Sequence, residues 1–182
     1  MLIIDNNDEA LAYIDRQPST STLAYYKLDS TTKLTDKMGN YNLTNTGGVT
    51  FGTNQGVDCA YFNGASNSQL YNSSMSFSAR PTQTVLIWFY VSSNNSNVYQ
   101  TIYHIGTTNS TGKLGTWFKY NLGLCIGSRA GGYESIKSGN VNGSRHCLAN
   151  VTNGSSCVQY LDGVEYQTYN NSLTNAQTAL YV

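Results

Sequence analysis

Short runs of apolar residues, many of them β-branched or aromatic, recur along most of this chain and are separated by turn residues. From residue 23 onward the turn signals return about every 8–14 residues, which is typical of a β-sandwich or a β-barrel. The pattern predicts strands at 23–28, 48–52, 57–63, 68–71, 83–92, 99–105, 114–120, 122–127, 132–137, 145–152, 156–161, 164–169 and 177–182.

The turns themselves are explicit in the sequence. Glycine-containing pairs mark them at Gly47-Gly48, Asn63-Gly64, Gly131-Gly132, Asn142-Gly143, Asn153-Gly154 and Asp162-Gly163. The clearest hairpin joins 156–161 to 164–169 through Asp162-Gly163. The stretch Thr84–Val91 is apolar at both odd and even positions, so we expect a strand buried on both faces, in the centre of a sheet and not at its edge.

A different periodicity appears at the N-terminus. Residues 6–16 have the spacing of a short amphipathic helix, with its apolar stripe at Ala10, Leu11, Tyr13 and Ile14. Pro18 ends the helix because the residue before a proline avoids helical angles. So short a helix needs a surface to dock on, which is its own domain, a second copy or a larger assembly. We therefore predict a docking arm at 1–22 and one sandwich at 23–182.

Composition and charge narrow the classes of partner. The 182 residues contain ten basic and ten acidic side chains, and only 11% of the residues are charged. With no basic field, nucleic acid and an anionic membrane surface are not expected as partners. No apolar run approaches the ~20 residues of a membrane span. The opening Met1–Asp5 is too short and too quickly acidic for a signal peptide, so none is expected.

The four cysteines, at 59, 125, 147 and 157, lack the close spacing of zinc or redox sites. Cys147 and Cys157 flank a predicted turn, so a hairpin disulfide is one interpretation. We favour the other, which is four buried free thiols, because no secretory leader is expected.

Four groups of segments resemble, in order, the motifs of one family. They are Leu23–Asp29 with Asp36–Asn40 and Gly47–Phe51; Gly56–Gly64; Gln83–Val91; and His146–Ala149 followed by Val158–Gly163. Together they resemble the concanavalin A-like, laminin G-like jelly-roll family from about residue 23 to the end. The resemblance implies an all-β sandwich of two antiparallel sheets with a lectin-like, non-catalytic role. Each motif concerns packing or turns, so the ligand stays open.

The chain departs from the family pattern in three places. Asn63 stands where the family has aspartate, and the tryptophan usual before the strand of His146 is missing. Family members also continue past the last predicted strand with one that pairs with the first. Here the sequence ends at Val182, so either the sheet lacks its last strand or a neighbouring subunit supplies it to the open edge.

Two kinds of binding site are candidates. Oxygen atoms of Asp36, Asn40 and Asn63 would suit calcium at one rim, unless Asp36–Asn40 is only a turn held by side-chain-to-backbone bonds. Fifteen tyrosines are present, and tyrosine both stacks on sugars and bonds their hydroxyls. We expect exposed, sugar-binding tyrosines at Tyr99, Tyr120, Tyr133 and Tyr169, although tyrosine also packs well on sheets.

Catalytic chemistry is not expected. A glycosidase needs two carboxylates facing one groove, and the ten here are scattered. Asp162 and Glu165 are close in sequence but flank a tight turn, so a structural role is favoured. His104 and His146 lie in apolar strands and are also interpreted as structural. The nucleophile-elbow and metalloprotease motifs are missing from the sequence.

The resulting hypothesis is a non-catalytic recognition or adhesion module that binds a surface glycan or polysaccharide. Its setting would be extracellular or on a virion surface, as a phage fibre or head-decoration protein that contacts other virion subunits or its own copies. The alternative is a purely structural capsid or tail protein, and a glycoside hydrolase is less favoured. Calcium is the one cofactor considered.

Overall fold

The computed structural model describes residues 21–65, 67–79, 82–92, 99–106, 114–119, 123–128, 133–139, 141–170 and 175–182. Within these ranges the chain is all β. Its strands are β1 Thr44–Thr46, β2 Thr50–Asn54, β3 Val57–Tyr61, β4 Gln69–Phe77, β5 Thr82–Tyr90, β6 Tyr99–Ile105, β7 Leu114–Lys119, β8 Gly123–Ser128, β9 Tyr133–Lys137, β10 Arg145–Asn153, β11 Ser156–Leu161, β12 Val164–Asn170 and β13 Gln177–Tyr181.

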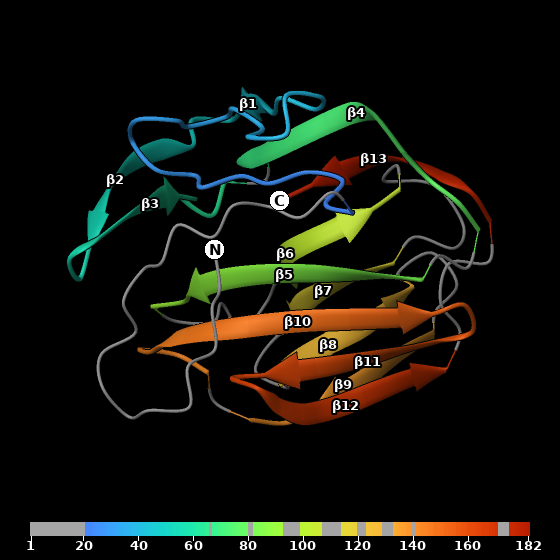
Figure 1. The fold of residues 1–182 in the computed structure, drawn as a ribbon. Helices are drawn as coiled ribbons and strands as arrows, with labels where there is room; N and C mark the ends of the chain where they lie inside the picture. Colours follow the sequence, from blue (N-terminus) through green and yellow to red (C-terminus); the bar gives the residue numbers. More distant parts are fainter. Residues whose placement is uncertain are drawn as a thin grey trace.

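Two antiparallel sheets face each other, and a small hairpin flanks them (Figure 1). The seven-stranded sheet has the order β1-β4-β13-β6-β7-β8-β9, and the four-stranded sheet has the order β12-β11-β10-β5. Strands β2 and β3 form the separate hairpin. Strands that lie far apart in sequence are therefore neighbours, above all β4, β13 and β6. The predicted fold class, an all-β sandwich of antiparallel sheets, is confirmed.

The hairpin between β11 and β12 shows how the sequence sets the turns. Asp162 has φ 52° and Gly163 has φ 81°, so both central residues adopt the left-handed conformation of a type I′ turn. That twist matches the twist of the paired strands, and aspartate followed by glycine tolerates it best. The predicted hairpin is confirmed, and its strand bounds are 156–161 and 164–170.

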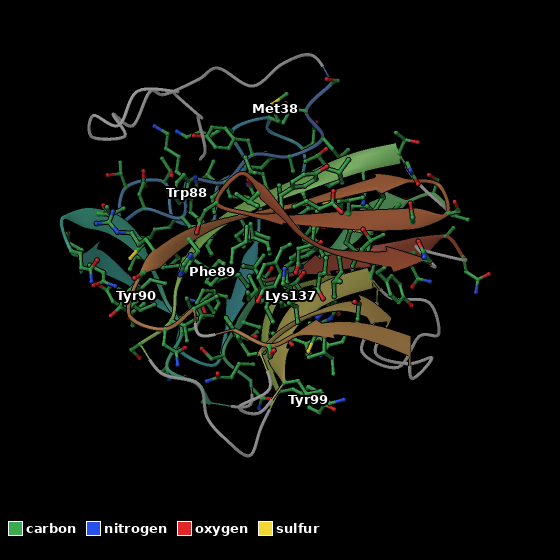
Figure 2. The ribbon with its side chains drawn as sticks, turned by 90° about the horizontal axis from the view of Figure 1, so that it is seen from below. Met38, Trp88, Phe89, Tyr90, Tyr99 and Lys137 are labelled. Atoms are coloured by element: carbon green, nitrogen blue, oxygen red, sulfur yellow. The ribbon has the colours of Figure 1, made fainter. Side chains whose placement is uncertain are left out.

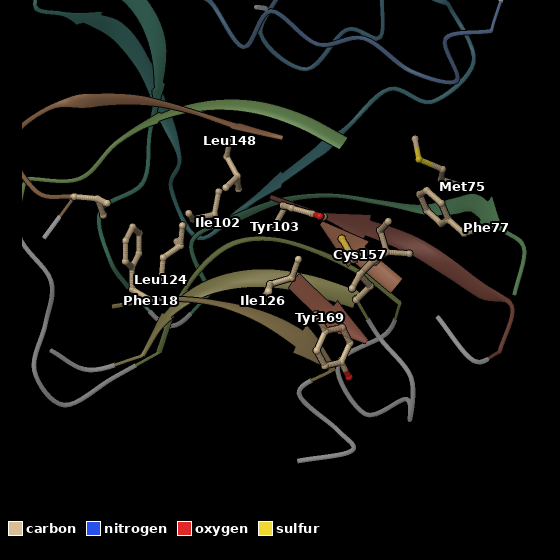
Figure 3. Close-up of a cluster of buried hydrophobic side chains, with 13 residues drawn as sticks. Met75, Phe77, Ile102, Tyr103, Phe118, Leu124, Ile126, Leu148, Cys157 and Tyr169 are labelled. Atoms are coloured by element: carbon tan, nitrogen blue, oxygen red, sulfur yellow. The ribbon is translucent and has the colours of Figure 1, made fainter. Parts of the chain in front are cut away.

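The hydrophobic core fills the space between the sheets (Figure 3). Its buried members are Met75, Phe77, Ile102, Tyr103, Ile105, Leu114, Phe118, Leu124, Ile126, Val141, Leu148, Cys157 and Tyr169. They come from alternate positions of facing strands, as expected when one face of each sheet is buried. A second, smaller cluster of Leu43, Val49 and Leu70 supports the β1 end.

A chain of buried polar side chains also links the two sheets. Asn150 Nδ2 donates hydrogen bonds to the Tyr103 hydroxyl at 2.5 Å and to Thr116 Oγ1 at 2.8 Å. Gln159 Nε2 donates to Thr116 Oγ1 and to Asn150 Oδ1, both at 3.1 Å. Gln167 Nε2 donates to Gln159 Oε1 at 2.7 Å. Because each amide finds partners, burying it costs little, and the network fixes how the sheets face each other.

Three expectations about the strands are wrong. Residues 23–28 form no strand, because the Tyr25 N–H is bound by Asp36 Oδ1 instead of by a neighbouring strand. The short strand β1 was not predicted. Strand β5, expected in the centre of a sheet, lies at the edge of the four-stranded sheet. Its inner positions face the core, but Leu86 on its outer face is 42% exposed.

The final strand lies inside the seven-stranded sheet and not at its edge. Strand β13 pairs with β4 on one side and β6 on the other. Val182 continues this pairing, since its backbone N–H and C=O bond Leu70 at 2.8 Å each. The predicted helix at 6–16 falls outside the described residues, and the domain division at residue 22 stays a prediction. No described segment is a helix with the length and apolarity to cross a membrane.

Candidate site on the outer face of the seven-stranded sheet

Three aromatic rings form a row on the outer face of the seven-stranded sheet. Leu70, Tyr103 and Ile105 point into the core, so their neighbours Tyr71 and His104 point away from it. Strand pairing then places Tyr71 opposite Tyr181 and Tyr181 opposite His104. The rings stack, with centroids 5.8 Å apart for Tyr71–Tyr181 and 4.4 Å apart for His104–Tyr181. We call Tyr71, Tyr181 and His104 the aromatic row.

Glycines continue the line of the aromatic row across the next two strands. Gly115 on β7 is paired with His104, and Gly127 on β8 is paired with Gly115. A Cβ added at Gly115 would lie 2.6 Å from the Tyr103 carbonyl oxygen and 2.8 Å from the His104 Cβ. Glycine is therefore required here because β7 passes too close to β6 for a side chain. The row of rings consequently ends beside positions that carry no side chain.

Trp117 lies beside these glycines on the same outer face. The residues before and after it, Thr116 and Phe118, face the core, and Trp117 belongs to neither core cluster. It is nevertheless only 2% exposed, and its indole N–H has no hydrogen-bond partner. Its cross-strand partner Cys125 is also buried. The middle of this face is therefore closed to water, and it holds an unsatisfied donor whose burial costs ~1–3 kcal/mol.

Polar groups surround the rings. Tyr99, at the start of β6, lies on this outer face, and Lys119 Nζ is 5.8 Å from the centroid of its ring. The exposed hydroxyl residues Ser76, Thr178 and Thr101 alternate onto the same face. Half-buried rings bordered by hydroxyls and a lysine can stack on one face of a ligand and bond its polar edge.

The four predicted tyrosines do not form one site. Tyr99 belongs to the face just described, and its binding role stays a prediction. Tyr120 lies outside the described residues, and Tyr133 begins β9 without a described side chain. The expected exposure of Tyr169 is wrong: it is 5% exposed and packs in the core (Figure 3). Its position in β12 turns its ring inward because Thr168 and Asn170 take the outer positions.

The Asp36 carboxylate organises a loop. Its Oδ1 accepts the N–H groups of Tyr25 and Met38 at 2.9 Å, and its Oδ2 accepts those of Asn40 at 3.1 Å and Tyr41 at 3.0 Å. Burial by itself would raise the pKa of the Asp36 carboxyl, but these four bonds outweigh it and hold the pKa below its ordinary value.

This arrangement favours the turn interpretation of Asp36–Asn40 over the calcium interpretation. Both oxygens of Asp36 already accept two N–H groups each, which leaves no lone pair for a cation. Asn63 Oδ1 accepts the Ala65 N–H at 2.9 Å. Among the described residues no group of three or more His, Cys, Asp or Glu side chains has the arrangement of a metal site.

The other described carboxylates also serve local structure. Asp162 Oδ2 lies 2.6 Å from His146 Nδ1, and Asp162 Oδ1 accepts the Cys147 N–H at 2.8 Å. Asp58 accepts the hydroxyl of Ser30. Asp29 accepts the backbone N–H groups of residues 31 and 32. The structural interpretation of Asp162 agrees with these bonds, since they tie the hairpin turn to β10.

The cysteines are free thiols, as expected. Cys125, Cys147 and Cys157 are buried. Burial raises the pKa of the Cys125 and Cys147 thiols to about 11 and that of Cys157 to about 12. These three thiols stay protonated and unreactive near neutral pH.

Sequence reasoning missed Tyr71, Tyr181 and Trp117 as site residues. The period-2 alternation does place each of them opposite the core positions of its own strand. The missing information was the strand order, because β4 and β13 are separated by most of the domain. His104 was interpreted as structural, and its stacking on Tyr181 is compatible with that.

Comparisons with known proteins support the architecture. No protein-family model matches the chain, and no curated protein sequence matches it. Among solved structures, domain 4 of AbnA, a GH43 extracellular arabinanase from Geobacillus stearothermophilus, in complex with arabinotriose, is similar with a TM-score of 0.59 and 17% identity. That match covers 82% of this chain and 77% of the other.

Two further structures share the fold. The carbohydrate-binding module CBM66 from Bacillus subtilis has a TM-score of 0.51 and 14% identity, covering 77% of this chain and 86% of that one. The Bacillus licheniformis β-glucanase has a TM-score of 0.50 and 12% identity over 63% of this chain. The match spans 56% of that enzyme's length. At such identities the likeness establishes the fold: this chain is a concanavalin A-like, laminin G-like jelly-roll sandwich.

Proposed function

We propose that this protein is a carbohydrate-binding module whose ligand lies against the aromatic row on the outer face of the seven-stranded sheet. The observation that carries the proposal is the stack of Tyr71, Tyr181 and His104 on a face that makes no contribution to the core. A sugar ring has an apolar face and a polar rim, which aromatic rings bordered by hydroxyls complement.

The unsatisfied indole N–H of Trp117 adds to the argument. A buried donor without an acceptor destabilises the free protein, and a hydroxyl or ring oxygen of a bound sugar is a suitable acceptor. Two of the fold relatives are described as a carbohydrate-binding module and as a domain in complex with arabinotriose. Their names give the same class of ligand.

The proposed role is binding without catalysis. Asp29, Asp36, Asp58 and Asp162 each have partners within local structure. A retaining or inverting glycosidase would need two carboxyl groups ~5–10 Å apart across a groove. The setting that we propose is the one predicted from the sequence: an extracellular or virion surface, where the module acts in adhesion as part of a fibre or decoration protein.

A polysaccharide-binding assay with paired variants tests the proposal. Wild type, Tyr181→Ala and Tyr160→Ala would be screened against immobilised neutral and acidic polysaccharides and then titrated with those that bind. Tyr160 is the matched control because it is a half-buried tyrosine on the outer face of the other sheet. We expect Tyr181→Ala to weaken binding at least tenfold, because stacking contributes ~1.4 kcal/mol or more, and Tyr160→Ala to bind like wild type.

Two results would count against the proposal. Equal affinities for wild type and Tyr181→Ala, with both folded by circular dichroism, would remove the aromatic row from the site. Absence of binding to every polysaccharide by a folded, multimerised wild type would favour the alternative of a structural capsid or tail protein.

A further inference from the structure

The outer face of the four-stranded sheet is unusually apolar. Strand alternation turns Leu86, Trp88, Ala149, Val151, Val158 and Tyr160 away from the core, and we call these six residues the apolar face. Leu86 is 42% exposed and Val151 is 37% exposed. Adjacent apolar residues on three paired strands form a contiguous patch of the kind that marks a contact surface.

Strand β5 makes the anomaly clearest. It is apolar on both faces, as the sequence shows, yet it is an edge strand. An edge strand with one exposed face is normally polar on that face. Trp88, which Figure 2 shows on the side of the molecule away from Tyr99, has a buried indole nitrogen without a hydrogen-bond partner. The composition of β5 therefore suits a strand whose outer face is covered.

We propose that residues 6–16 of the same chain cover the apolar face as an amphipathic helix. This segment lies outside the described residues, and its sequence has an apolar stripe of Ala10, Leu11, Tyr13 and Ile14 with no place in the core. A helix of that length is ~16 Å long, and four strands ~4.8 Å apart span ~14 Å. The stripe and the sheet are thus matched in size.

The connection to the sandwich is long enough. Residues 17–22 join the helix to the described part of the chain, and six extended residues span up to ~20 Å. The two sheets of a sandwich lie only ~10 Å apart. The linker therefore allows the helix to reach the outer face of the chain that carries it, so a second copy is not needed.

Charge distinguishes this occupant from another apolar partner. Residues 1–20 contain four of the ten acidic side chains and one of the ten basic ones, so residues 21–182 contain six acidic and nine basic ones. The segment thus has a formal charge of −3 and the rest of the chain +3. Arg145, paired with Tyr90 at the end of β10 and β5, lies beside the apolar face. The opposite charges favour docking within one chain.

Site-specific photo-crosslinking in the full-length protein tests the proposal. A benzophenone amino acid would replace Leu11 on the stripe in one variant and Ala12 in the matched control, because residue 12 lies on the opposite side of an ideal helix. We expect position 11 to link, within one chain, to peptides containing Leu86–Trp88 or Ala149–Tyr160, with several times the yield of position 12. Links from position 11 to the seven-stranded sheet, equal yields at both positions, or links mainly between two copies would overturn the proposal.

A substitution provides a second readout that does not depend on crosslinking. Ile14→Asp should expose the apolar face and raise the fluorescence of an added hydrophobic dye severalfold, while Ala12→Asp leaves it unchanged. Near-ultraviolet circular dichroism of both variants shows whether the sandwich is intact. Unchanged dye fluorescence in a folded Ile14→Asp variant would contradict the docking of residues 6–16. Neither experiment involves a sugar, so its outcome is independent of the proposed function.

Discussion

At the scale of single residues, Asp36 has the largest number of described backbone partners. Replacing it by asparagine keeps the shape but leaves one acceptor oxygen for four N–H groups that now accept from two oxygens. We expect Asp36→Asn to lower the free energy of unfolding by about 2–4 kcal/mol, because bonds to a charged group contribute ~1.5–3 kcal/mol each and some will be remade with water. Urea denaturation measures this. Asn40→Ala is the control, since only the backbone of residue 40 bonds Asp36; an equal loss there would contradict the argument.

The same carboxylate predicts how stability depends on pH. Its pKa in the folded protein is lowered, so its contribution is complete above the unfolded value of ~4 and is lost as pH falls through the folded value. Asp29 acts in the same direction: burial would raise its pKa, but bonds from residues 31 and 32 lower it. Wild type should therefore lose stability more steeply below pH ~4 than Asp36→Asn. Parallel curves for the two proteins would show that Asp36 is not responsible.

Two glycines separate backbone strain from steric overlap. Gly163 has φ 81° and nothing within 4 Å of an added Cβ, whereas Gly47 has φ 71° and an added Cβ would overlap the Asn67 carbonyl. We expect Gly163→Ala to cost ~1–2 kcal/mol from backbone conformation alone and Gly47→Ala to cost clearly more. Thermal unfolding compares them. A Gly47→Ala protein as stable as Gly163→Ala would mean that the 47–67 contact is readily relaxed.

At the scale of elements, the buried polar network joins strands that the sequence does not show to be close. Asn150→Ala removes two donated bonds and one accepted bond, leaving Gln159 and the Tyr103 hydroxyl without those partners. We expect a loss of ~2–4 kcal/mol, while exposed Thr178→Ala should change stability by less than ~0.5 kcal/mol. Denaturant unfolding of both variants checks this, and a stable Asn150→Ala protein would show that water replaces the amide.

The strand pattern explains which elements could be predicted. The runs at 99–105 and 156–161 agree with β6 and β11 because alternation and turn residues are local signals. Residues 23–28 have the same local pattern but form no strand, since Asp36, eleven residues away, takes the Tyr25 N–H. Strand β5 was assigned to a sheet centre from its apolar outer face. Local sequence cannot tell whether such a face is covered by a strand's own sheet, by a helix or by a partner.

At the scale of the whole molecule, the fold followed from the order of motifs, but the candidate site did not. Tyr71, Tyr181 and His104 come together only because β13 inserts between β4 and β6. That insertion depends on long-range pairing, including the bonds of Val182 to Leu70. The predicted tyrosines were chosen by residue type and local exposure, so they include Tyr169, which the core buries. Site prediction failed where strand order mattered.

The two tryptophans provide a probe for each outer face. The chain contains only Trp88 and Trp117, and strand alternation places Trp117 on the outer face of the seven-stranded sheet and Trp88 on that of the four-stranded sheet. A proton–nitrogen correlation spectrum therefore has one indole signal for each sheet. Trp117→Phe and Trp88→Phe variants assign the two signals without further labelling.

Titration of the ¹⁵N-labelled protein with an oligosaccharide of a bound polysaccharide tests the central claim most directly. The account predicts that the Trp117 indole signal shifts saturably, because its N–H gains an acceptor beside the aromatic row, while the Trp88 signal stays in place. Saturable movement of Trp88 with Trp117 unchanged would place the sugar on the other sheet. Binding that moves neither signal would contradict a site at the aromatic row.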